Sequence, residues 1–179
     1  IDNLNDFKPK FATGRISASN NNEALIIATK LYNYMVNPTF GSWRSEIALV
    51  ADDQNSQFGY SDSELDHTIY SNNIYQNISN YLNSTQFYGI NYESQENGNT
   101  ISKLQMTADI IDYINQGTSL INYIGHGSQN TLGHEKIIDM QRDIENICGL
   151  GSLCQNQNKQ PIWVVGTCSF GEYDVDEKI

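Results

Sequence analysis

The sequence predicts an α/β fold, a three-layer α/β/α sandwich around a mostly parallel sheet. Short apolar runs alternate along the chain with longer stretches of helical periodicity, which is typical of strands joined by helices that pack on both faces of one sheet. The run at 46–52 (EIALVAD) is almost continuously apolar, as expected of a strand covered on both faces. No repeat or linker interrupts the pattern, so we expect residues 1–179 to form one domain.

The individual elements follow from local patterns and their end signals. Asn20 and Glu23 resemble a capping box at a helix start, and Gly117 stands where a left-handed helix cap is preferred. We expect Trp43 and Trp163 to be core aromatics, with Trp163 facing a helix. We expect a short strand or strand end at 14–19 and strands at 46–52 and 86–93. We expect 119–128 to be a strand that runs into a glycine-flanked loop, and 161–171 to be a buried strand that opens into a second loop. A turn is expected at 97–99, and helices at 20–37, 63–82, 101–114 and, weakly, 136–147.

Charge and hydropathy argue against two classes of partner, nucleic acids and membranes. The formal net charge is −11 and is spread over the chain, whereas nucleic-acid binding requires clustered Lys and Arg. No run approaches the roughly 20 apolar residues of a membrane span, so we predict no membrane insertion by this segment. Residue 1 is Ile and opens no signal peptide; we therefore expect the chain to be a piece of a longer protein, with targeting signals outside it.

Three cysteines, Cys148, Cys154 and Cys168, leave at least one thiol free whatever pairing occurs. Cys148 and Cys154 lie six positions apart and can form a disulfide in an oxidising compartment, which the sequence leaves open. A zinc site requires further His or Cys ligands at close spacing, and none follows.

Two predicted strands end at residues that can perform chemistry. His126 ends the strand LINYIGHG, and Cys168 ends the strand IWVVGTC. Parallel sheets place ligands at the carboxyl ends of their strands, so the two residues lie side by side if those strands are neighbours. A thiolate attacks a carbonyl carbon, and an imidazole protonates the departing amine near neutral pH. Each residue alone is more often inert, a buried cysteine or a loop histidine, but their shared setting favours a Cys-His pair.

Glycines surround the predicted histidine and suggest a place for the oxyanion. Attack on a carbonyl builds negative charge on its oxygen, which preorganised N–H donors stabilise. Because Gly125 and Gly127 carry no side chain, the amide of Gly127 can approach a substrate and form an oxyanion hole with the amide of Cys168.

Two motifs carry a resemblance to a known family. NYIGHGS (122–128) followed by VVGTCSFGEYD (164–174) resembles the paired His and Cys motifs of gingipain-type cysteine peptidases. TCSFGEYD is most similar to the members that serve as the surface sortase-like peptidase of the bacterial type IX secretion system. The opening DFKPKFATGRISASNNNEA (6–24) also resembles that group, so the resemblance spans nearly the whole chain.

The resemblance implies a caspase-like fold, a Cys168–His126 dyad, and an oxyanion hole from the amides of Gly127 and Cys168. It also implies a secreted or bacterial cell-surface setting. The sequence departs from the family in a long connection at 148–160 and in ending soon after the nucleophile, where the family supplies further strands and pocket walls. We therefore expect a domain truncated after the nucleophile loop.

Acidic residues after the strand at 46–52 form a second group of candidates. Asp52, Asp53 and Asp62 belong to a polar loop of the kind that calcium favours, although the spacing matches no EF-hand. The alternative is a solvated loop in which Asp62 or Ser63 caps the next helix. The proposed chemistry requires no cofactor, and calcium would be structural.

Further residues are assigned to the rim of the site. Asp52 and His67 share the predicted face of the sheet and can contact substrate there. Glu135 can orient His126 or bind a basic substrate group, or it can be an ordinary surface residue at a helix start. His134 is expected to be an exposed loop residue without a role.

These observations predict a cysteine endopeptidase, with transpeptidation as a possible outcome, that acts on protein or peptide substrates. The alternative is a catalytically inactive caspase-like module that binds or scaffolds within a larger surface protein. A nucleotide-binding domain is a weaker third hypothesis, because no Gly-rich phosphate loop with a Lys follows the first strand.

Overall fold

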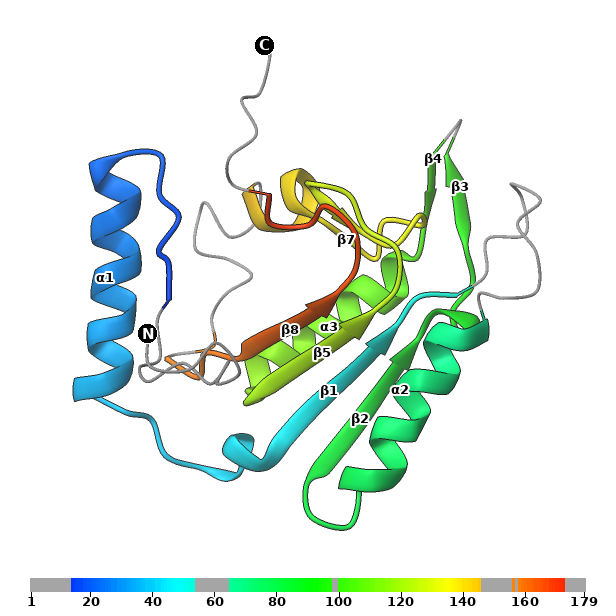
Figure 1. The fold of residues 1–179 in the computed structure, drawn as a ribbon, viewed down its shortest axis with the longest axis horizontal. Coiled ribbons are helices and arrows are strands. Elements are labelled where there is room, and N and C mark those ends of the chain that lie inside the picture. The colour runs from blue at the N-terminus through cyan, green and yellow to red at the C-terminus, as the bar shows by residue number, and fades with distance from the viewer. Residues whose placement is uncertain (1–13, 54–64, 98–99, 146–155, 157, 173–179) are drawn as a thin grey trace, which may run out of the picture.

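A four-stranded parallel sheet forms the centre of the protein (Figure 1). The computed structural model describes residues 14–53, 65–97, 100–145, 156 and 158–172. The strands stand in the order β2-β1-β5-β8 and every neighbouring pair is parallel, which confirms the predicted α/β fold. Their bounds are β1 (Glu46–Ala51), β2 (Asn83–Tyr88), β5 (Leu120–Ile124) and β8 (Ile162–Gly166).

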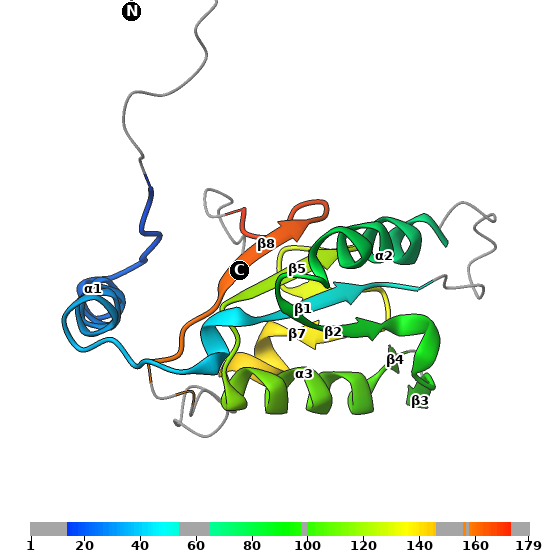
Figure 2. The same ribbon diagram turned by 90° about the horizontal axis from the view of Figure 1, so that it is seen from below.

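Two helices cover opposite faces of this sheet, and two hairpins lie near its carboxyl edge (Figure 2). The helices are α2 (Leu65–Ile78) and α3 (Leu104–Gln116). The antiparallel pairs are β3 (Gln95–Asn97) with β4 (Thr100–Ser102) and β6 (Thr131–Leu132) with β7 (Ile138–Asp139). Short 3₁₀ turns η1 (Ser42–Ser45) and η4 (Gly89–Asn91) and a π-helical turn η5 (Met140–Glu145) complete the fold.

The core lies mainly between the sheet and α3. Met106 and Ile110 of α3 are buried against Val50, Ile121 and Tyr123. Alternate residues of β1 point to the other face, where Ile47, Leu49 and Ala51 form a smaller cluster with α2. Burial of both faces explains why β1 is almost continuously apolar.

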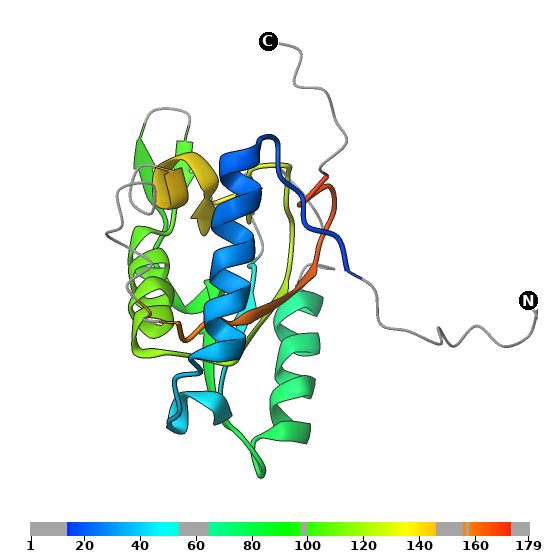
Figure 3. The ribbon, with the colours of Figure 1, turned by 90° about the vertical axis from the view of Figure 1, so that its left-hand side faces the viewer.

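Helix α1 (Asn21–Val36) starts where its cap predicts. The Asn20 side chain accepts a hydrogen bond from the Glu23 N–H at 3.0 Å, and the Glu23 carboxylate accepts one from the Ser19 N–H at 2.8 Å. None of its residues is buried, however. Helix α1 stands apart from the sheet on the side of β8 (Figure 1), and Figure 3 views the molecule from that side. Local periodicity therefore predicts that these residues form a helix, but it does not identify a surface that would cover the apolar side chains of the helix.

Three predicted elements are corrected by the structure. Residues 14–19 form no strand, because this exposed segment has no strand beside it. The strand predicted at 86–93 starts at Asn83 and ends at Tyr88, followed by the turn η4. The weak helix predicted at 136–147 is replaced by β7 and the turn η5, and the hairpin β6–β7 was not predicted.

The burial of β8 was also predicted wrongly. Ile162, Trp163 and Val164 are 66%, 38% and 47% exposed, so Trp163 is not a core residue, whereas Trp43 is buried as expected. β8 is an edge strand, and no other described strand pairs with its outer side. An apolar run predicts a strand from local sequence, but which segments cover that strand depends on the rest of the fold.

None of the described helices is both long enough and apolar enough to cross a membrane.

Replacing Ile110 with Ala tests the α3 side of the core. Ile110 is 1% exposed, and deletion of buried methyl and methylene groups leaves a cavity; we expect the free energy of unfolding to fall by about 2–4 kcal/mol in urea denaturation. Ile69→Ala on α2 is the matched control, because Ile69 is 51% exposed, and its expected loss is below about 1 kcal/mol. Equal losses in the two variants would contradict the described packing.

Candidate active site

His126 and Cys168 follow two neighbouring strands at the same edge of the sheet. β5 and β8 are parallel, with Ile124 opposite Gly166. His126 comes two residues after Ile124, and Cys168 comes two residues after Gly166. The two strands are therefore neighbours, as a Cys-His pair requires, and both residues leave the sheet at equivalent positions.

Contacts join the two loops on either side of this pair. The Gly125 N–H donates to the Gly166 carbonyl at 3.3 Å. A Cβ on Gly127 would lie 2.5 Å from Thr167 Oγ1, so the two backbones meet closely there. Further out, Gln129 Nε2 donates to Glu172 Oε2 at 3.4 Å. Along the first loop these contacts lie on both sides of His126, and along the second loop they lie on both sides of Cys168.

The Cys168 loop is a tight turn that exposes a free thiol. Cys168 is exposed and forms no disulfide. The Phe170 N–H donates to the Cys168 carbonyl, and Ser169 has a left-handed φ of 32°. The Phe170 side chain packs against the core on the α3 side of the sheet. The turn is thus anchored by one side chain while the sulfur remains accessible.

The backbone of His126 is fixed from several directions. Its N–H donates to Asp52 Oδ2 at 3.1 Å. Its carbonyl accepts from the Tyr123 hydroxyl at 2.6 Å and from the Gly133 N–H at 2.8 Å. Asp52 and Tyr123 are both 0% exposed, so groups anchored in the interior determine where the histidine leaves the strand.

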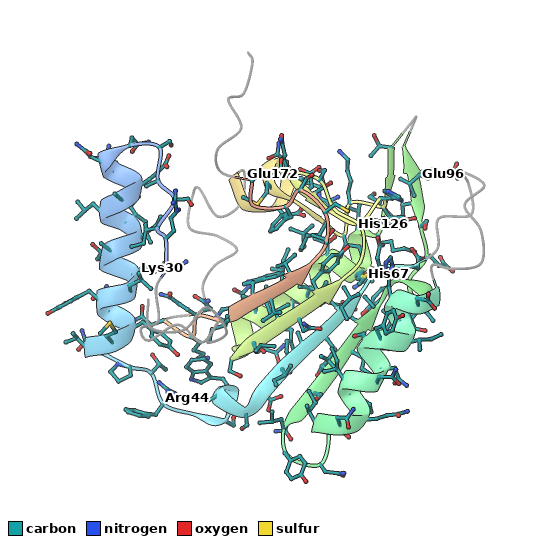
Figure 4. All side chains as sticks on the ribbon, viewed as in Figure 1. Lys30, Arg44, His67, Glu96, His126 and Glu172 are labelled. Atoms are coloured by element: carbon teal, nitrogen blue, oxygen red, sulfur yellow. The ribbon has the colours of Figure 1, made fainter. Side chains whose placement is uncertain are left out.

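All three histidines of the chain meet at this point. The His126 ring stacks on His134, with centroids 4.2 Å apart and an interplanar angle of 10°. On another side it meets the ring of His67 edge-on at 5.1 Å and 84°. Figure 4 shows His126 and His67 together at the carboxyl edge of the sheet. His134 is exposed, as predicted, but its contact with His126 was not.

Two backbone amides at the loops have no acceptor in the described part of the chain. No hydrogen bond is assigned there to the N–H of Gly127 or of Cys168. Gly127 pairs with Leu132 as an isolated bridge, in which the bonds are made by the residues on either side. Both amides are thus available as donors.

The family model for Peptidase family C25 matches residues 2–178. The chain belongs to this family. It is the gingipain family of cysteine peptidases, whose substrates are proteins or peptides. No curated protein and no solved structure matches the chain.

A buried charged cluster lies beneath the His126 loop of this C25 chain. One oxygen from each of Asp52, Asp53 and Glu135 lies within 4.8 Å of the others. Lys103 Nζ pairs with Asp53 Oδ2 at 2.9 Å, and its backbone N–H donates to the Glu135 carbonyl at 3.1 Å. Asp52, Lys103 and Glu135 are 0%, 2% and 3% exposed.

This burial corrects the expected positions of two residues and adds a third. Asp52 does not contribute an exposed side chain to the rim, because its carboxylate holds the His126 amide from below. Glu135 is not a surface residue, while His67 does reach His126. Lys103 was missed, because a lysine before a helix resembles any solvated residue and its partner Asp53 lies 50 positions away.

The environment of Glu135 disfavours its negative charge. Burial and, after it, the negative charges of Asp52 and Asp53 raise its pKa to about 7, against smaller lowering effects of a backbone hydrogen bond and of Lys103. The same setting raises the pKa of the Tyr123 hydroxyl, first through burial and then through Asp52 and Glu135. Of the residues expected to bind calcium, Asp52 and Asp53 lie together in this cluster, and Asp62 lies outside the described residues.

Replacing Gly127 with Ala tests the contact between the two loops. The new Cβ would lie 2.5 Å from Thr167 Oγ1 and 2.9 Å from Thr167 Cγ2, so we expect a loss of about 1–3 kcal/mol in unfolding free energy by urea denaturation. Gly166→Ala is the control, because its nearest contact would be 3.5 Å. Thr167→Ala removes both clashing atoms and should restore much of the loss; an equal cost of Gly127→Ala in that background would contradict the contact.

Glu135 predicts a specific pH dependence of stability. Its pKa is about 7 in the folded chain against an ordinary value of 4.5, so the folded state binds the proton more tightly and this part of the stability is lost as pH rises through 7. In chelator-containing buffer we expect the free energy of unfolding of wild type, relative to Glu135→Gln, to fall by about 3 kcal/mol between pH 4.5 and 8.

Chemical denaturation at a series of pH values measures this difference. Glu93→Gln is the control, because Glu93 is exposed. The same change of charge at this position should leave the pH dependence of the free energy of unfolding as it is in wild type. If the free energy of unfolding of Glu135→Gln falls with pH as steeply as that of wild type, the carboxyl of Glu135 is not the cause of this pH dependence.

Proposed function

We propose that the chain is a cysteine endopeptidase in which Cys168 is the nucleophile and His126 transfers the proton. The observation that carries the proposal is the set of contacts that brings the His126 loop against the Cys168 loop: Gly125 with Gly166, Gly127 with Thr167, and Gln129 with Glu172. Membership of family C25 supplies the reaction class. The free, exposed thiol of Cys168 is suited to attack the carbonyl of an external peptide.

In the proposed reaction, Cys168 loses its proton to His126 and the sulfur attacks the scissile carbonyl carbon. The carbon–nitrogen bond then breaks, and the imidazolium of His126 gives its proton to the departing amine. The acyl group remains on Cys168 as a thioester. A water molecule, deprotonated by His126, attacks the thioester, and the carboxylic acid leaves as the thiol is restored. No cofactor takes part.

The amides of Gly127 and Cys168 are the proposed donors for the developing oxyanion. Neither amide has another acceptor within the described residues. An amide aimed at the charge that forms during attack lowers the barrier without further rearrangement.

The nature of the second nucleophile and the cellular setting belong to the same proposal. If an amine instead of water resolves the thioester, the outcome is transpeptidation, as in a sortase-like peptidase. The similarity of TCSFGEYD (167–174) to the type IX secretion members supports secreted proteins as substrates and a bacterial surface location. The catalytically inactive scaffold remains the competing outcome of the test below.

Replacing Cys168 with Ala in the full chain should abolish both cleavage of a peptide library and labelling by a thiol-directed peptide probe, since no other residue is proposed as nucleophile. Replacing His126 with Gln should lower cleavage by about 10²–10⁴-fold while leaving the thiol in place. Mass spectrometry of cleaved peptides and of the labelled protein measures both effects.

The double variant Cys148→Ala/Cys154→Ala is the control for loss of the other cysteines and should retain wild-type cleavage. Cleavage that persists undiminished in Cys168→Ala would exclude the assignment of the nucleophile. A wild-type chain that neither cleaves nor takes up the probe, under conditions where circular dichroism shows it folded, would favour the scaffold.

A further inference from the structure

The three carboxylates beneath the His126 loop, two of them buried, have the dimensions of a cation site. Asp52 and Asp53 follow β1, and Glu135 belongs to the segment between β6 and β7; one oxygen from each lies within 4.8 Å of the others. Two oxygens bound at about 2.4 Å on opposite sides of a calcium ion are about 4.8 Å apart. The separation therefore allows one ion to contact all three.

Two of the oxygens have no partner. Asp53 Oδ1 and Glu135 Oε2 are buried and make no hydrogen bond. Glu135 is only 3% exposed, so water in bulk does not satisfy this oxygen. Unsatisfied acceptors in the interior are costly, and their presence beside other carboxylate oxygens points to a positively charged ligand that the carboxylates share.

Lys103 cannot satisfy these oxygens, because its three N–H donors already face Asp53 Oδ2, the Tyr92 carbonyl and Ser94 Oγ at 2.9, 2.8 and 3.1 Å. Asp53 Oδ1 and Glu135 Oε2 are therefore left for another ligand.

We propose that Asp52, Asp53 and Glu135 form a calcium site. The ligand atoms are all carboxylate oxygens, which hard cations prefer, and no histidine nitrogen or cysteine sulfur among the described residues completes a softer site. Calcium tolerates irregular geometry better than magnesium. Gly133 allows the close approach, since a Cβ there would lie 3.1 Å from Asp52 Oδ1.

The site has a direct link to the catalytic loop. Asp52 Oδ2 accepts the His126 N–H at 3.1 Å, so an ion that fixes the Asp52 carboxylate also fixes the start of that loop. This consequence rests on the proposed function, whereas the binding of the ion does not.

Calorimetric titration of the chelator-treated full chain with CaCl₂ at pH 8 tests the proposal without any activity measurement. We expect one site in wild type, about tenfold or more weaker binding in Glu135→Gln, and unchanged binding in the exposed control Glu93→Gln. We also expect CaCl₂ to raise the Tm of wild type more than an equal concentration of MgCl₂ does.

The absence of a binding isotherm in folded wild type would overturn the proposal and leave a shared proton as the compensation within the cluster. Binding of equal strength in wild type and Glu135→Gln would overturn it as well, because the ion would then lie elsewhere. If Glu135→Gln does not fold by circular dichroism, Asp53→Asn replaces it, with the same expected loss and the same contradicting result.

Discussion

The parallel pairing of β5 with β8 is the constraint on which the rest of the site depends. It sets Ile124 opposite Gly166 and so carries His126 and Cys168 to one edge of the sheet. The close approach of Gly127 to Thr167 then brings the two loops together. A shift of one residue in this register would turn every side chain of β8 to the other face and separate the two loops from their present contacts.

Four ionisable side chains meet beneath these loops. Asp52 holds the His126 backbone and Lys103 pairs with Asp53, while Asp53 Oδ1 and Glu135 Oε2 make no hydrogen bond. Burying ionised groups carries a desolvation penalty that usually offsets their attraction. Because this cluster lies directly under the histidine loop, we infer that its role is to position that loop, with a proton or a cation as the compensating charge.

The sequence predicted the parallel sheet and the placement of His126 and Cys168, because strand-end rules depend on local patterns alone. It did not predict that β8 is an exposed edge, since apolar residues such as Ile162 and Val164 show strand preference but do not identify what covers them. The burial of Glu135 and its proximity to Lys103 were also missed. Both depend on contacts between segments far apart in the chain, for which charge and spacing carry no local signal.

The most direct test of the account is a crystal structure of the full chain with a peptide aldehyde bound covalently. The account predicts a bond from Cys168 Sγ to the aldehyde carbon and a His126 ring nitrogen within about 6 Å of that sulfur, a limit wider than hydrogen-bond reach. It also predicts the resulting oxygen at about 2.7–3.1 Å from the N–H nitrogens of Gly127 and Cys168. A bound peptide with His126 turned away from the sulfur, or with the oxygen directed away from both amides, would contradict it.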